Sequence, residues 1–269
     1  MTLTALRPIV VPARARLRRP VVSELIVIFF LLRVYDFARA HADVRRDHAL
    51  RHARSVLDLE RALHLDPERA VNTALHHHRH LSLLAVDWYQ YLHIPVTLGV
   101  LLALWVLRPA LYRPLRTALV LLNVVGLAVF LLWPLAPPRL LPGAGFVDSV
   151  SSAGHAVGGS AQIPLDQYGA MPSLHIAWAV WSAAALVLLL GHFRWRHLVW
   201  LYPLTTSVVV VATANHYVAD VAAGAFTALC ALQLALRTAT LYCIPAPRVS
   251  ADDAARSRRP DAVPALNAE

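Results

Sequence analysis

Residues 171–190 read MPSLHIAWAVWSAAALVLLL, an apolar run with no acidic or basic side chain except His175. A helix that crosses a bilayer needs about 20 mostly apolar residues. The run is therefore predicted to be a transmembrane helix that starts at Pro172 and Ser173, with His175 close to its polar end. The whole chain agrees, because 58% of its 269 residues are hydrophobic and only 15% are charged. Soluble domains carry about 45–50% apolar and about 25% charged residues.

Further apolar stretches extend this prediction to an all-α polytopic membrane protein with a six-transmembrane helix bundle. The predicted spans cover about residues 21–38, 82–106, 117–134, 173–190, 198–214 and 217–241. Residues 39–80, between the first two spans, are polar and rich in histidine, with apolar residues at near-helical spacing. We expect this segment to form amphipathic helices that lie on the membrane interface.

The distribution of arginine predicts the orientation of the chain. Arginines gather in the N-terminal tail, between spans two and three, between spans four and five, and after span six. The positive-inside rule then places both termini in the cytoplasm and the long connection 135–172 on the outer face. We expect a basic cytoplasmic tail over 1–20, the membrane domain over 21–243 and a disordered cytoplasmic tail over 244–269. Cleavage of the first span at Ala38-Arg39-Ala40 is an alternative.

The net charge of +9 comes from a basic set that contains arginine and no lysine. Nucleic acid is not the expected partner, because single-strand binders interleave basic residues with stacking aromatic side chains and no such run occurs here. A set of basic residues restricted to arginine indicates a genome rich in G and C, which fits a bacterial inner membrane. Membrane topology explains the charge better than nucleic-acid binding does.

Polar residues gather at the predicted outer ends of the spans. Arg139 follows the third span, His175 opens the fourth, and His216 and Asp220 lie where the fifth span turns into the sixth. Spans four and five form a hairpin, so His175 and His216 are expected to return to the same face of the membrane. Asp220 follows His216 by four residues, which is one turn of a helix.

These residue types suit phosphoryl transfer. An imidazole nitrogen of His216 can attack phosphorus when its other nitrogen donates to a carboxylate, the role expected of Asp220. A protonated His175 can give its proton to the departing alkoxide. Arg139 offers a planar fork for two phosphate oxygens, and Ser173 marks a helix start that favours an anion. The scheme needs no cofactor and no metal ion.

The motifs Pro172-Ser-Leu-His175 and His216-Tyr-Val-Ala-Asp220 resemble the type 2 phosphatidic acid phosphatase superfamily. Over about residues 80–240 the chain is most similar to the branch that contains the inositol phosphorylceramide synthases, which the Pro-Pro-Arg run 137–139 and the Gly-Phe-Val-Asp run 145–148 also fit. The resemblance implies a six-helix bundle, metal-independent catalysis and a phosphohistidine intermediate. His216 then matches the nucleophile, Asp220 its partner and His175 the general acid.

The chain departs from the phosphatase pattern at three points. Val209 and Val210 occupy the positions of a Ser-Arg pair, Leu174 stands where many phosphatases have glycine, and the chain has no lysine for the first phosphatase motif. These differences leave Arg139 as the best phosphate ligand. They favour the lipid phosphotransferase branch, an inositolphosphotransferase-like enzyme, over a simple phosphatase.

Three aromatic residues are candidates for a substrate pocket. Tyr89 and His93 lie one turn apart in the outer half of the second span, and Tyr168 belongs to the outer connection. The histidine-rich run 76–80 is expected to be exposed and not to bind a metal ion, because neighbouring histidines on a helix point in different directions.

The sequence predicts an enzyme that acts on a lipid phosphate at the outer face of the membrane. The acceptor is a polyol, a sugar or a lipid alcohol. Water as acceptor would make the protein a phosphatase of the phosphatidate or polyprenyl phosphate type. A catalytically idle membrane scaffold and a small transporter are alternatives of another class. A transporter agrees less well, because transporters place polar sites near the bilayer midplane.

Overall fold

The computed structural model describes residue 33 and residues 45–149 and 168–242. Apart from Arg33, the first predicted span lies outside the described residues, as do both predicted tails. The described part is helical and contains no strand, which confirms the all-α prediction. Its elements are α2 (Arg46–Ala62), α3 (Glu68–His76), α4 (Arg79–Asp87), η2 (Trp88–Leu92), α5 (His93–Leu107), α6 (Pro109–Leu132), η3 (Pro138–Leu140), α8 (Leu174–Leu190), η4 (Arg196–Trp200), α9 (Leu201–Ala212) and α10 (Val218–Tyr242).

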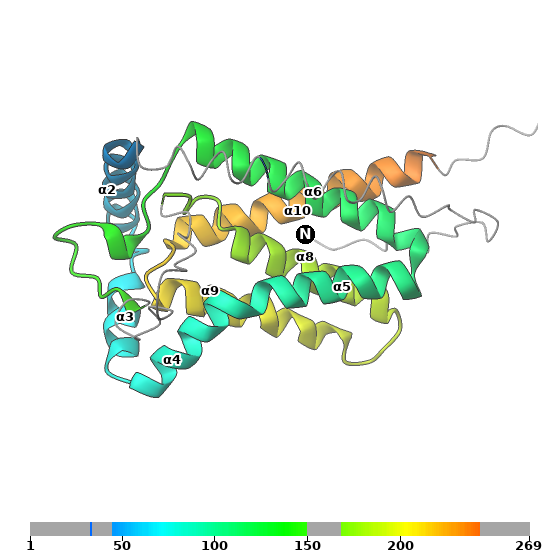
Figure 1. Ribbon diagram of the computed structural model, residues 1–269, viewed down its shortest axis with the longest axis horizontal. Helices are drawn as coiled ribbons and strands as arrows, with labels where there is room; N and C mark the ends of the chain where they lie inside the picture. The colour runs from blue at the N-terminus through cyan, green and yellow to red at the C-terminus, as the bar shows by residue number, and fades with distance from the viewer. Residues whose placement is uncertain (1–32, 34–44, 150–167, 243–269) are drawn as a thin grey trace, which may run out of the picture.

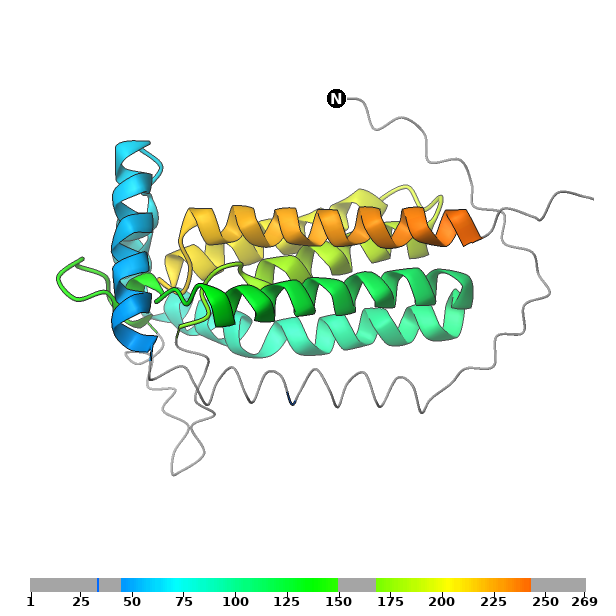
Figure 2. The same ribbon diagram turned by 90° about the horizontal axis from the view of Figure 1, so that it is seen from above.

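Five long helices, α5, α6, α8, α9 and α10, run side by side as a bundle (Figures 1 and 2). Helix α8 contacts each of the other four, so it lies at the centre of the bundle. Its Trp181 is fully buried, and the indole Nε1 donates to the backbone carbonyl of Leu115 in α6 at 2.8 Å. A buried indole needs such a partner. Leu104, Leu122 and Ile176 fill the surrounding core.

The start of α8 packs directly against α10. Ser173 is the N-cap residue of α8, and its hydroxyl oxygen accepts from the backbone N–H of Ile176 at 3.4 Å. On the facing helix, a Cβ added to Gly224 would lie 2.3 Å from the Ser173 carbonyl oxygen. Only glycine permits this approach. The contact fixes the separation of the two helix starts that carry His175 and Asp220.

Within the described residues, three helices are long and apolar enough to cross a membrane: Arg79–Leu107, which joins α4, η2 and α5, then Pro109–Leu132 and Val218–Ala239. They indicate a membrane protein. Two shorter apolar helices, Leu174–Leu190 and Arg196–Ala212, complete the bundle. The number of six spans stays a prediction. Large apolar side chains are exposed along the outside of the bundle, as a surface in contact with lipid requires, among them Leu98, Leu102, Leu132, Leu204, Val208 and Phe226.

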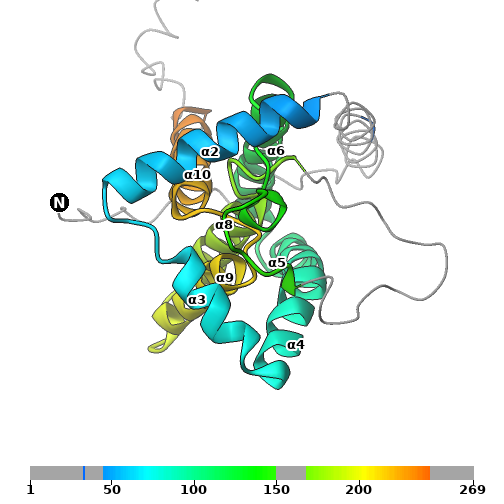
Figure 3. The ribbon, with the colours of Figure 1, turned by 90° about the vertical axis from the view of Figure 1, so that its left-hand side faces the viewer.

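Helices α2 and α3 lie across one end of the bundle (Figures 2 and 3). They fall within residues 39–80, where the sequence predicts amphipathic helices. One face of α2 is buried, with Ala49, Ala53 and Val56 packed in a second core, while Leu59 and Leu63 are exposed. This second core also contains Leu135 and Tyr217, so α2 covers the end of the bundle where the loops meet.

Candidate active site

The predicted catalytic residues meet at the end of the bundle covered by α2 and α3. His175 lies in the first turn of α8, His216 in the loop between α9 and α10, and Asp220 in the first turn of α10. The rings of His175 and His216 are 5.8 Å apart between centroids, and their planes are inclined by 61°. The return of the two histidines to one end, expected from the hairpin of spans, is therefore present.

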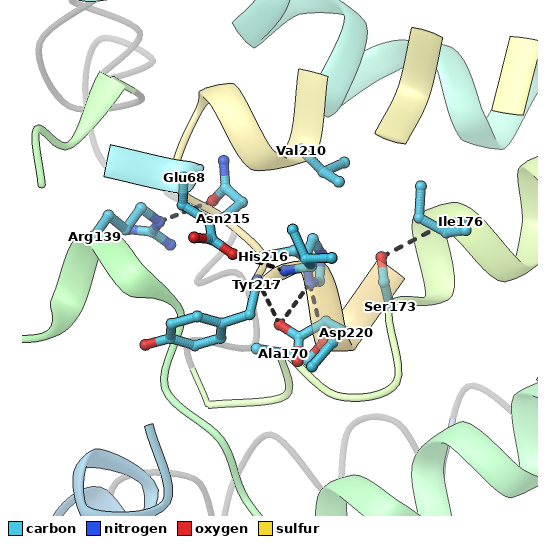
Figure 4. A network of polar contacts seen from close by, with 12 residues as sticks. Glu68, Arg139, Ala170, Ser173, Ile176, Val210, Asn215, His216, Tyr217 and Asp220 are labelled. Carbon is cyan, nitrogen blue, oxygen red and sulfur yellow. Dashed lines mark hydrogen bonds and ion pairs between the residues drawn. The ribbon is translucent and has the colours of Figure 1, made fainter. Parts of the chain in front are cut away.

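His216 is held through its Nδ1 atom (Figure 4). Nδ1 lies 2.9 Å from the backbone carbonyl oxygen of Ala170 and 3.4 Å from Oδ2 of Asp220. A carbonyl oxygen can only accept, so the proton belongs on Nδ1 and Nε2 keeps its lone pair. The sequence assigns the orientation of this ring to Asp220, but the shorter contact is the carbonyl. A backbone carbonyl acceptor cannot be predicted from the sequence, because every residue type carries one.

Besides its contact with His216, Asp220 accepts two hydrogen bonds from backbone N–H groups. Its Oδ2 accepts from the backbone N–H of Tyr217 at 2.9 Å, and its own carbonyl accepts from the N–H of Ser173 at 3.1 Å. The four-residue spacing brings Asp220 to His216 as expected, although His216 itself lies in the loop before α10, which begins at Val218. The carboxylate points back to that loop and is fully buried there.

A tight turn after α9 presents His216. The backbone N–H groups of Asn215 and His216 both donate to the carbonyl of Val210, at 3.0 and 3.1 Å. Ala214 adopts a φ of 52°, a left-handed conformation that is strained for a residue with a Cβ. The Asn215 amide donates to the Thr213 hydroxyl at 2.9 Å. These bonds leave the loop little freedom, so the position of His216 is well defined.

Arg139, the predicted phosphate ligand, lies beside the same loop. Its Nε donates to Oδ1 of Asn215 at 2.8 Å, and its backbone N–H donates to the Ala214 carbonyl at 3.0 Å. Its Nη1 lies 3.3 Å from Oδ2 of Asp148, with side chains that are 9% and 27% exposed. The guanidinium is thus held between Asn215, the residue that precedes His216, and the carboxylate of Asp148.

The other predicted residues divide into two groups. Tyr89 stacks on His175 with ring centroids 4.4 Å apart, and His93 meets His175 edge-on at 4.3 Å. Tyr89 lies in the π-helical turn η2, a local widening that is frequent at functional sites. Tyr168 instead belongs to the second core, where its carbonyl accepts from the N–H of Leu135. The structure therefore brings two of the three pocket candidates to His175.

The structure also places Ser173, the histidine-rich run and one cysteine. The Ser173 hydroxyl caps α8 and the side chain is fully buried. Residues 76–80 are all exposed, as expected for that run. Among the described cysteines, Cys230 is free and exposed on α10, while Cys243 lies outside the described residues.

Two buried glutamates near the site are not singled out by the sequence analysis. Glu60 of α2 accepts from the backbone N–H of Ala219 at 2.7 Å, and Glu68 of α3 accepts from that of Val218 at 3.0 Å. Burial raises the pKa of Glu60 to about 8, against the hydrogen bond from Ala219, and the neighbouring charge of Glu68 raises it further. A sequence signal exists, because Glu60 lies on the buried face of α2, four residues after Val56.

Asn72 is a further buried residue that the sequence analysis missed. Its amide nitrogen donates to the carbonyls of Ala212 and Val147, at 2.9 and 3.1 Å, and its amide oxygen accepts from the N–H of Val147 at 2.8 Å. It thereby joins α3 to the end of α9 and to the segment that leads to Asp148. Both connections border the loop of His216.

A family model described as the PAP2 superfamily matches residues 54–234. The match covers more than half of the chain and contains every described residue of the site. The chain belongs to the PAP2 superfamily. PAP2 superfamily members are generally phosphatases, and membership indicates a phosphatase or phosphotransferase of lipid phosphates. The matched part begins within α2, so the helices that cover the site belong to the PAP2 unit. No curated protein and no solved structure matches this chain.

Proposed function

We propose that this PAP2 superfamily protein is an integral membrane enzyme that transfers or removes a phosphate-containing head group of a lipid through a phosphohistidine at His216. The observation that carries the proposal is the bond from His216 Nδ1 to the Ala170 carbonyl, which leaves Nε2 as a lone-pair nucleophile on a ring next to that of His175. A nucleophile with its opposite nitrogen tied to an acceptor is the arrangement that covalent catalysis requires.

The reaction has two balanced steps. Nε2 of His216 attacks phosphorus, a P–N bond forms, and the P–O bond to the leaving alcohol breaks. His175 gives a proton to the departing alkoxide, and Asp220 stabilises the cationic ring of His216. An acceptor alcohol or water then attacks phosphorus, His175 takes its proton, and the P–N bond breaks to restore His216.

Arg139 and the start of α8 are the proposed phosphate ligands. The guanidinium lies next to the loop of His216, and Ser173 stands at the N-terminal end of α8, where backbone N–H groups favour an anion. Asp148 now contacts Nη1 of Arg139, so a bound phosphate has to share or replace that contact. The scheme uses this chain's own side chains and requires no metal ion.

The proposed activity is most like that of an inositolphosphotransferase, with a polyol, sugar or lipid alcohol as acceptor. It is supported by Val209 and Val210, which replace the Ser-Arg pair of the phosphatase pattern. Hydrolysis of a phosphatidate or polyprenyl phosphate is the alternative within the superfamily. We further propose that the site lies at the outer face of a bacterial inner membrane, with cytoplasmic termini.

Turnover of labelled lipids tests the proposal. Purified protein in detergent is given a panel of phosphate-labelled lipids with and without polyol acceptors, beside a His216→Ala variant. Transfer of label to an added alcohol supports a transferase, and release as free phosphate supports a phosphatase. Equal turnover by the variant and the wild type would contradict the proposal, and no turnover by either would favour an idle scaffold or a transporter.

A further inference from the structure

Three carboxyl groups converge on three consecutive backbone amides at the start of α10. Asp220 accepts from the N–H of Tyr217 at 2.9 Å, Glu68 from that of Val218 at 3.0 Å, and Glu60 from that of Ala219 at 2.7 Å. The first N–H groups of a helix have no partner within the helix and need an outside acceptor. All three amides therefore depend on side chains at this one point.

Two of these acceptors come from remote parts of the chain. Glu68 and Glu60 precede their amides by 150 and 159 residues, whereas an ordinary N-cap side chain is only two or three residues away. They belong to α3 and α2, the helices that cover the end of the bundle. The start of α10, and with it Asp220 and the adjoining His216, is therefore held from outside the bundle.

The two glutamates are buried in a way that does not suit two full charges. Glu60 is 4% exposed and Glu68 is 0% exposed. Their carboxyl groups accept from the adjacent backbone amides of Val218 and Ala219, which places the two carboxyl groups next to each other. Oε2 of each is buried without a donor among the described residues. A single proton between the carboxyl groups satisfies both orphaned oxygens, whereas two unpaired buried carboxylates would be very costly.

Other charged groups around Glu60 and Glu68 add to the need for a shared proton. The charge of Asp220 on α10 acts on Glu60, and the charges of Asp220 and both glutamates act on Tyr217. Arg61, the residue after Glu60, makes ion pairs with Asp58 and Asp66 at 3.8 and 3.9 Å. The positive end of α10 contributes only about half a unit charge against three carboxyl groups.

We infer that Glu60 and Glu68 are positioning residues that share one proton and clamp the start of α10, so that His216 and Asp220 stay aligned for phosphoryl transfer. The inference rests on the proposed function. The pair does not touch the reacting atoms; it acts through the backbone of Val218 and Ala219. Loss of the shared proton places like charges beside Asp220 and loosens the clamp.

The pH dependence of turnover distinguishes this role from simple structural support. Burial raises the pKa of Glu60 to about 8, so the proton is retained at neutral pH and lost above that value. We expect kcat of the wild type to fall on the alkaline side with a midpoint near that pH. In Glu60→Gln the amide oxygen still accepts from Ala219 and the amide nitrogen donates to Glu68, which imitates the protonated state at every pH.

The experiment measures kcat and KM against pH for wild type, Glu60→Gln, Glu60→Ala and the control Asp58→Asn on the exposed face of α2. We expect Glu60→Ala to lose about 100-fold in kcat, as a shift of about 1 Å in a catalytic group does, with KM nearly unchanged. Glu60→Gln should restore most of that loss and should lack the alkaline fall assigned to Glu60. Asp58→Asn should behave as the wild type.

Two results would overturn the inference. The first is a Glu60→Ala variant with the same kcat as the wild type. The second is a Glu60→Gln variant whose kcat falls at alkaline pH as that of the wild type does. If Glu60→Ala does not fold, the pH profile of kcat for Glu60→Gln decides alone.

If the wild type turns over no lipid, the proposed function fails separately, and infrared spectroscopy then tests whether Glu60 and Glu68 share a proton. The C=O band of a protonated carboxyl, present at pH 7 and lost in Glu60→Gln, supports the shared proton, and its absence refutes it.

Discussion

Gly224→Ala tests whether the contact between α8 and α10 sets the geometry of the site. The added Cβ would lie 2.3 Å from the Ser173 carbonyl oxygen and 3.2 Å from its carbonyl carbon, and both are backbone atoms that cannot turn aside. Ordinary contact begins at about 3.4 Å, so the helices must separate by about 1 Å. Because Ser173 N–H bonds to the Asp220 carbonyl, that shift moves the two sides of the site apart.

The expected effects follow from this displacement. Overpacking costs about 1–3 kcal/mol, while alanine in place of glycine within a helix returns about 1 kcal/mol. We therefore expect a net loss of up to about 2 kcal/mol in the free energy of unfolding, seen as a lower Tm in detergent. A misplacement of about 1 Å costs about 100-fold in rate, so kcat should fall far more than stability does.

Two other glycines provide graded controls. A Cβ on Gly99 of α5 meets nothing within 4 Å, and a Cβ on Gly126 of α6 meets only the Leu174 side chain, at 2.6 Å. The Leu174 side chain can rotate, so we expect Gly126→Ala to be milder than Gly224→Ala and Gly99→Ala to be neutral. Equal Tm and equal kcat for Gly224→Ala and Gly99→Ala would refute the reasoning.

Three further predictions follow from the described contacts. Asp220→Asn keeps an oxygen for the Tyr217 N–H but removes the charge beside His216, so kcat should fall about 100-fold with little change in KM, measured by steady-state turnover. Asn72→Leu leaves buried backbone groups without hydrogen-bond partners, which costs about 1–3 kcal/mol of stability for each group, so the Tm should fall strongly. An unchanged Tm would contradict the hydrogen bonds assigned to Asn72. The raised pKa of Glu60 implies stability that is full below its ordinary value of 4.5 and is lost as pH rises to about 8. Tm in detergent should decline over that interval, and Glu60→Gln should decline less.

The helices themselves could be predicted because apolar run length determines them. The predicted spans 82–106, 117–134 and 217–241 appear as the helices Arg79–Leu107, Pro109–Leu132 and Val218–Tyr242. Their ends agree with the prediction within about three residues, except that the second helix begins at Pro109. The meeting of His175 and His216 follows from the same principle, since two consecutive crossings return the chain to its starting side. Neither inference needs knowledge of tertiary packing.

The parts that the sequence missed depend on contacts between distant segments. The Ala170 carbonyl that holds His216 is a backbone group 46 residues away, and any residue type could supply it. The carboxyl groups on α10 come from α2 and α3, where the sequence shows only an acidic residue on an amphipathic helix. The sequence predicts Tyr168 to be a pocket residue from its place in the outer connection. Its backbone pairing with Leu135 instead directs it into the second core.

Chemical trapping of the intermediate tests the central claim most directly. Wild-type protein, His216→Ala and Asp220→Asn are mixed with a phosphate-labelled lipid in detergent, quenched with denaturant, and assayed for label bound to protein. The account predicts label on the wild type that is lost in acid and kept in alkali, as expected for a phosphorus–nitrogen bond, and none on His216→Ala. Label on His216→Ala at the wild-type level, or a wild type that turns over without ever carrying label, would contradict it.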